Sequence, residues 1–157
     1  MVFTMPAKEF KNLTLSPEDD AAGRKRCYCY VSVSNIPAHL RACVVGEVEE
    51  RPSVEQIAEW LETKPKQFHL LAPKVVLHTE KFVFDNRKNK LSFELENIEY
   101  QGVICGGNTL LAVLDNRKEC SSDTPDGEVY IEMELLKGLS KEEVDMVVEQ
   151  RKIDRVE

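Results

Sequence analysis

A pair of glycines followed by two hydrogen-bonding side chains is the part of this sequence best suited to bind a ligand. The run YQGVICGGNTLLAVLD, residues 100–115, predicts a strand, a glycine turn and the start of a helix. Backbone N–H groups at such a helix start can face an anion closely, which suits a phosphate. Asn108 or Thr109 could add a side-chain donor. We therefore predict a ligand site at Gly106, Gly107, Asn108 and Thr109.

The same turn lacks two well-defined phosphate-binding patterns. A P-loop needs a lysine shortly after its glycines, and a dinucleotide fingerprint needs a third glycine. Neither residue follows Gly107 at the required position. Glycine at a strand-to-helix turn also serves a purely conformational purpose in many folds. The motif alone therefore leaves two interpretations open, a binding turn and a structural turn.

The five cysteines are odd in number and irregular in spacing, which fits a reducing compartment better than a disulfide framework. Cys27, Cys29, His39 and Cys43 could supply tetrahedral ligands to zinc, but their spacing is not a standard one. Free cysteines commonly act as small buried apolar side chains, so we expect no metal site and no cofactor. Cys105 could be a nucleophile only beside a base, and the sequence places no histidine near it.

A formal net charge of −7 over 157 residues disfavours general attraction to phosphate backbones, because nucleic-acid binding depends on clustered Lys and Arg. Only local basic groups could bind a phosphate backbone. Two such groups are Arg24, Lys25 and Arg26 before a predicted strand, and Arg87, Lys88 and Lys90 in a predicted hairpin tip. Short groups of this kind are usually solvated loops, and we interpret both in that way.

The N-terminal stretch MVFTMPAKEF has no uninterrupted apolar core of the kind that a signal peptide needs. No run of about 18 apolar residues occurs in the sequence either. We therefore expect a cytoplasmic protein that does not enter a membrane. Residues 1–23 contain prolines and a polar stretch with little periodicity, which predicts an irregular N-terminal arm. Residues 24–157 have the length and composition of a single α+β domain.

Periodic patterns predict the elements that would position the glycine turn. The expected strands cover residues 27–34, 74–84, 90–96, 99–105 and 128–136, and the second and third form a hairpin. The expected helices cover residues 53–63 and 108–118, and a last helix opens at the capping box of Ser140 and Glu143. Residues 119–127 should form an exposed loop. Because several strands adjoin directly, the class is α+β, with a mixed sheet and about three helices.

Two further segments suggest a family. The stretch KPKQFHLLAPKVVLHTEKF precedes an acidic hairpin, then the glycine motif, then VYIEMELLKGLSKEEVDMVVEQRK. In this order, the region from Pro65 to Arg151 resembles the abortive-infection phage-resistance (AIPR) family, whose glycine motif is similar to "GIxDGGHT". More distantly, the motif resembles the "DGxHR" turn of ParB-type and DndB-type proteins, which lies at a nucleotide or nucleic-acid site. The resemblance implies a ParB-like strand, glycine turn and helix at the core.

This chain departs from the family pattern at two positions that matter for chemistry. Cys105 stands where the motif has Asp, and Asn108 stands where it has His. A buried thiol and an amide cannot replace a carboxylate or an imidazole in proton transfer, so we predict no catalytic residue. AIPR-like proteins usually continue well past the length of this chain, so the resemblance implies that the chain looks like their N-terminal module alone. Functions located in the missing region do not carry over.

We favour a non-catalytic binding or regulatory module associated with phage defence. It would recognise a phosphate-bearing ligand, such as a nucleotide or nucleic acid, or a protein partner. The alternative is an enzyme, a ParB-like nuclease or nucleotide-hydrolysing domain. Such an enzyme would need a carboxylate cluster near the glycine turn, and Asp85, Glu99 and Asp115 are the nearest candidates in the sequence.

Overall fold

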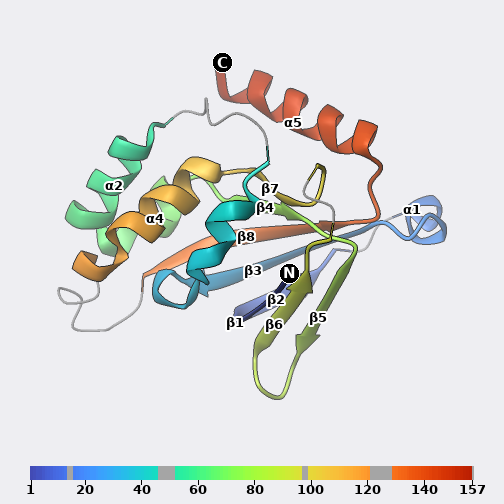
Figure 1. The fold of residues 1–157 in the computed structure, drawn as a ribbon, viewed down its shortest axis with the longest axis horizontal. Coiled ribbons are helices and arrows are strands. Elements are labelled where there is room, and N and C mark those ends of the chain that lie inside the picture. Colours follow the sequence, from blue (N-terminus) through green and yellow to red (C-terminus); the bar gives the residue numbers. More distant parts are fainter. Residues whose placement is uncertain (14–15, 46–51, 97–98, 121–128, 157) are drawn as a thin grey trace.

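The chain forms a five-stranded sheet in the order β2-β3-β8-β4-β7 and a three-stranded sheet in the order β1-β6-β5 (Figure 1). The computed structural model describes residues 1–13, 16–45, 52–96, 99–120 and 129–156. The strands are β1 (Val2–Pro6), β2 (Lys8–Asn12), β3 (Lys25–Ser32), β4 (Val75–His78), β5 (Lys81–Asp85), β6 (Lys90–Glu94), β7 (Gly102–Cys105) and β8 (Tyr130–Lys137). The α-helices are α1 (Pro17–Ala21), α2 (Val54–Thr63), α3 (Phe68–Leu71), α4 (Gly107–Cys120) and α5 (Lys141–Val156), and the 3-10 helices are η1 (Val33–Asn35), η2 (Ala38–Cys43) and η3 (Pro65–Gln67).

The large sheet is mixed, because β8 pairs antiparallel with β3 and parallel with β4. This arrangement confirms the predicted α+β class with a mixed sheet. Among the described residues, no helix combines the length and the apolar character needed to cross a bilayer.

The two faces of the large sheet have different covers, because side chains alternate along a strand. On one face, Cys27 and Cys29 of β3 share a core with Leu110 of α4. On the opposite face, Val144 of α5 packs with Val76 of β4. Figure 1 shows α5, in red, crossing the sheet apart from α2 and α4. Helices α2 and α4 therefore cover one face, and α5 covers part of the other.

Several elements lie where the sequence patterns predict them. The hydroxyl of Ser53 accepts the backbone N–H of Gln56 at 3.1 Å, which caps α2 at the expected residue. Both halves of the second capping box are present before α5, with Ser140 N–H bonded to Glu143 at 3.1 Å and Glu143 N–H bonded to Ser140 at 3.2 Å. The hairpin of β5 and β6 is confirmed as well. Most of the loop expected at residues 119–127 lies outside the described residues.

The N-terminal segment differs from the irregular arm that we expected. It forms β1 and β2, which pair with β6 and β3, and then the short helix α1. Phe3 and Met5 point into the core while their neighbours are exposed. This alternation is too short to be distinctive in the sequence, and the partner strand β6 lies more than eighty residues away, with Val2 opposite Glu94. Long-range pairing therefore creates order that local patterns do not signal.

The expected strand over residues 74–84 is two strands in different sheets. β4 belongs to the large sheet and β5 to the small one. The chain changes sheets at Thr79, whose buried hydroxyl donates to the backbone carbonyl of Glu94 at 2.6 Å. Both strands are rich in Val, Leu and Phe, and the polar residues 78–81 that separate them mark the break.

Candidate functional site

The glycine turn at residues 106–109 packs tightly against the chain that enters β4. Gly106 has a φ of +77°, and a Cβ atom there would lie 2.2 Å from the carbonyl oxygen of Lys74. Only glycine tolerates both conditions. Gly107 is the first residue of α4, so the predicted strand, turn and helix are present. The turn brings the end of β7 against Lys74 and so helps to place that lysine.

The structure brings the four predicted ligand-binding residues together, and all four are buried. The amide of Asn108 donates to the backbone carbonyl of Pro52 at 3.1 Å. The hydroxyl of Thr109 donates to the backbone carbonyl of Pro73 at 2.8 Å. These bonds fasten the start of α4 to the segments before α2 and β4. They explain the polar residues of the motif structurally, and ligand binding at this turn stays a prediction.

A cluster of charged side chains lies on the other side of β4 and β8. Glu134 of β8 is fully buried, with an exposed fraction of 0%. Its two carboxylate oxygens accept a bidentate pair from Arg151 at 3.0 and 3.1 Å, a bond from Arg26 Nε at 2.9 Å and one from Lys74 Nζ at 2.9 Å. We call Arg26, Lys74 and Arg151 the cation cluster. It combines β3, the start of β4 and α5 around one carboxylate.

The charges of this cluster do not cancel. Burial opposes ionisation of Glu134, but the hydrogen bonds and charges of Arg151 and Lys74 outweigh it and hold the pKa of Glu134 below its usual value. An ionised Glu134 supplies one negative charge to three cations, which leaves an excess of two positive charges. The side chains of Arg26, Lys74 and Arg151 are 38%, 32% and 26% exposed. Solvent can therefore reach the excess charge.

A row of tyrosines continues from the cluster along β3 and β8. Register places Tyr28 opposite Glu134, Tyr30 opposite Glu132, and Ser32 opposite Tyr130. Because opposite residues of an antiparallel pair share a face, the three tyrosines lie on the same side of the sheet as the cluster. We call the surface of Tyr28, Tyr30 and Tyr130 the tyrosine face.

Cations contact the rings at both ends of the tyrosine face. Lys74 Nζ lies 5.0 Å from the centre of the Tyr28 ring, and Arg26 lies 5.4 Å from it. At the other end, Lys8 Nζ lies 3.8 Å from the centre of the Tyr130 ring. These are cation–π distances. All three rings remain partly exposed.

A shallow cleft opens at each end of this face. One, of about 200 Å³, has Lys8, Tyr30, Lys88 and Tyr130 in its walls. The other, of about 210 Å³, has Arg24, Arg26, Leu136 and Arg151 in its walls. Both basic groups that the sequence suggested to be solvated loops thus contribute to a cleft, through Arg24, Lys25 and Arg26 at one end and Lys88 at the other.

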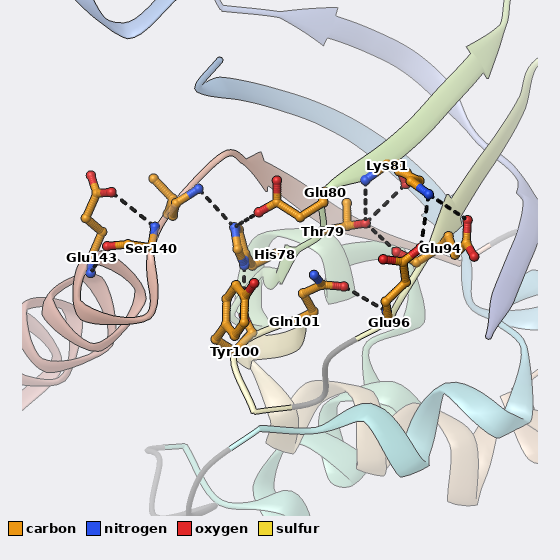
Figure 2. Close-up of polar contacts among 11 residues, drawn as sticks. His78, Thr79, Glu80, Lys81, Glu94, Glu96, Tyr100, Gln101, Ser140 and Glu143 are labelled. Carbon is orange, nitrogen blue, oxygen red and sulfur yellow. Dashed lines mark hydrogen bonds and ion pairs between the residues drawn. The ribbon is translucent and has the colours of Figure 1, made fainter. Parts of the chain in front are cut away.

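A buried histidine bonds the turn before α5, the helix that carries Arg151. Figure 2 shows His78 between Tyr100 and the turn that leads into α5. The backbone N–H of Leu139 donates to His78 Nε2 at 3.2 Å, so Nδ1 carries the hydrogen that is donated to the carbonyl of Tyr100 at 2.8 Å. His78 therefore links the end of β4, the approach to β7 and the start of α5.

The cysteines and the histidine considered for zinc binding or nucleophilic attack lie in surroundings that favour neither role. Burial raises the pKa of Cys27 to about 11 and that of Cys29 to about 12. His39 is exposed, and its ring stacks on Phe3 at 4.4 Å. Cys105 is buried beside α5. No group of three or more His, Cys, Asp or Glu side chains within the described ranges is arranged to hold a metal ion.

The three carboxylates considered for an enzyme do not gather at the glycine turn. Asp85 accepts the backbone N–H groups of Arg87 and Lys88 in the β5–β6 hairpin. Asp115 is exposed on α4 and pairs with Arg41. Glu99 is exposed in the segment between β6 and β7.

Sequence reasoning missed the centre of the charged cluster. The alternation of residues 128–136 places Glu134 on the side of its strand opposite the apolar residues, and the structure buries it there under α5. Arg26 belonged to a recognised basic group. Lys74 and Arg151 gave no signal, because the sequence does not show that they meet at one carboxylate.

The chain matches no protein-family model, no curated protein and no solved structure. The AIPR resemblance and the ParB-like core stay predictions.

Proposed function

We propose that the chain is a non-catalytic binding module that holds a phosphate-bearing ligand at the cation cluster and the adjoining tyrosine face. The observation that supports this most strongly is the convergence of three partly exposed cations on one buried carboxylate. A protein with a net charge of −7 here concentrates positive charge at one place. Such a local field attracts anions against the overall charge.

The cluster also has donors left for a ligand. The described bonds to Glu134 use Nε of Arg26, one Nζ donor of Lys74 and two terminal donors of Arg151. A guanidinium carries five N–H donors and an ammonium carries three. Glu134 thus orients the three cations, and their side chains stay partly exposed. Arginine forks match the oxygens of a phosphate especially well.

The same geometry favours binding over catalysis. Glu134 is held ionised by its partners, so it is poorly suited to take up a proton from a substrate. The buried thiols of Cys27 and Cys29 have raised pKa values, which disfavours the nucleophilic thiolate. In this proposal the glycine turn supports the site from behind, by packing on the backbone of Lys74. A role in phage defence is the biological context that the family resemblance predicts.

Thermal unfolding with added inorganic pyrophosphate or adenosine monophosphate tests the proposal. A ligand that prefers the folded state must raise the Tm. We expect such a rise for the unaltered chain, and we expect Arg26→Gln and Lys74→Gln to reduce it by about half or more. Arg41→Gln is the matched control for Arg26, since Arg41 also pairs with one carboxylate but contacts Asp115 of α4.

Lys66→Gln is the control for Lys74, because Lys66 is exposed in η3. Both control variants should respond to the ligands as the unaltered chain does. If neither ligand raises the Tm, or if all four variants respond equally, the proposal is wrong.

A further inference from the structure

We infer that the ligand of the tyrosine face is a single-stranded nucleic acid that runs from one cleft to the other. This inference rests on the proposed function and adds the substrate class. It depends on three observations: the spacing of the clefts, the cations at each of them, and the tyrosines along the path.

The two clefts are each too small for a whole cofactor, and they lie at opposite ends of one strand. Their volumes of about 200 and 210 Å³ fall below the range of about 300–1,000 Å³ that is common for small-molecule sites. Arg26 lines one and Ser32 lines the other, six residues apart on β3. Six strand residues span about 20 Å. A ligand that reached from Arg26 in one cleft to Ser32 in the other would need to be a chain of about this length.

Cations occur at both ends of that path. Arg26 and Arg151 line the first cleft, and Lys8 and Lys88 line the second. Repeated negative charges along the ligand would meet positive charge at each end. At about 3.4 Å per stacked nucleotide, 20 Å corresponds to about six nucleotides. The backbone of a short strand therefore matches the charge pattern.

The tyrosines along this path distinguish a nucleic acid from other polyanions. Tyr28 lies between the two clefts, Tyr30 belongs to the wall of the second cleft, and both rings are partly exposed. A partly exposed aromatic ring on a sheet offers a stacking surface to an unpaired base, and stacking is largely independent of sequence. The bases of a duplex are stacked on each other inside the helix and cannot reach such a ring. The face therefore favours single strands over duplexes.

Fluorescence anisotropy with a labelled single-stranded oligothymidylate of eight nucleotides tests this inference. We expect Tyr30→Leu to weaken binding by about tenfold, because a stacked base is lost. Tyr30→Phe keeps the ring and should bind like the unaltered chain. Lys88→Gln should weaken binding severalfold and lower the slope of log Kd against log salt by about 0.7, whereas Lys66→Gln should change neither.

Two competition experiments complete the test, one with a duplex of the same length and one with poly-glutamate. We expect both competitors to displace the oligonucleotide poorly. Equal displacement by poly-glutamate would mean that the face recognises acidic polymers in general, and equal displacement by the duplex would mean that bases are not contacted. Either result overturns the inference.

The pyrophosphate experiment separates the inference from the proposed function. If Arg26→Gln lowers the response to pyrophosphate while Tyr30→Leu and Lys88→Gln bind the oligonucleotide normally, the nucleic-acid path is wrong and the phosphate site stands. If the unaltered chain binds neither pyrophosphate nor the oligonucleotide, both are wrong. Should Tyr30→Leu fail to fold, Lys88→Gln and its salt dependence still decide the inference.

Discussion

The glycine turn contacts the backbone of Lys74 and the tyrosine face contacts its side chain. The two regions differ in how the chain builds them. The turn is continuous in sequence, fully buried and bonded to neighbouring backbone. The tyrosine face and its cation cluster draw on β3, the start of β4, β8 and α5, and remain partly exposed. The conspicuous motif is explained by packing, and the accessible chemistry comes from residues that only the fold brings together.

The largest expected effect concerns the turn. Gly106→Ala places a Cβ atom 2.2 Å from the Lys74 carbonyl at a φ of +77°, and we expect it to lower the free energy of unfolding by about 4 kcal/mol. Gly23→Ala is the matched control, because Gly23 has a φ of +76° but has nothing within 4 Å of the added atom. It should cost about 1 kcal/mol. Urea unfolding measures both, and equal costs would show that the close approach to Lys74 is unimportant.

Glu134→Gln affects the other region and separates stability from binding. Removing the carboxylate leaves three neighbouring cations without their shared anion, so we expect a loss of about 3 kcal/mol in unfolding free energy. The freed cations should at the same time bind pyrophosphate more tightly. Calorimetric titration of the folded variant measures this affinity. An unchanged affinity would contradict the idea that Glu134 and the ligand share the same cations, and a weaker one would show that orientation by Glu134 outweighs the gain in free charge.

The pH dependence of the same variant sharpens the comparison. The partners of Glu134 hold its pKa below the ordinary value of 4.5, so the unfolded chain takes up a proton first as the pH falls. The resulting stabilisation is complete above about pH 5.5 and declines as the pH drops below about 4.5. Between pH 6 and the acid limit of folding, the unaltered chain should therefore lose more unfolding free energy than Glu134→Gln does. If the unfolding free energies of the two proteins fall in parallel as the pH drops, the lowered pKa of Glu134 is refuted.

The smallest effect is expected at Asn108, and it bears on the binding turn that the sequence predicts. Asn108→Ala removes the bond to the Pro52 carbonyl and should cost about 1 kcal/mol in stability. Affinity for pyrophosphate should remain within about twofold of the unaltered chain, because the cation cluster is untouched. A loss of affinity as large as that of Lys74→Gln would move the site back to the glycine turn.

Local patterns were sufficient for much of the fold and for little of the site. Capping residues such as Ser53 and Ser140 mark helix starts by bonds three residues away, and such short-range chemistry is visible in a sequence. The strand β1 and the change of sheet at Thr79 depend on partners far along the chain. The surroundings of Glu134 also depend on a distant partner, because Arg26 lies 108 residues before it in the chain. Alternation predicts which side a residue faces but not whether a helix covers that side.

Nuclear magnetic resonance titration of the unaltered chain with inorganic pyrophosphate tests the central claim most directly. The account predicts shifts in the Nε–H signals of Arg26 and Arg151 and in the backbone amides of residues 26–30 and 130–134. It also predicts that the amides of residues 106–109 shift less, since they lie behind Lys74 and not at the ligand. Shifts concentrated at residues 106–109, with the two arginines and the tyrosine face unchanged, would contradict it.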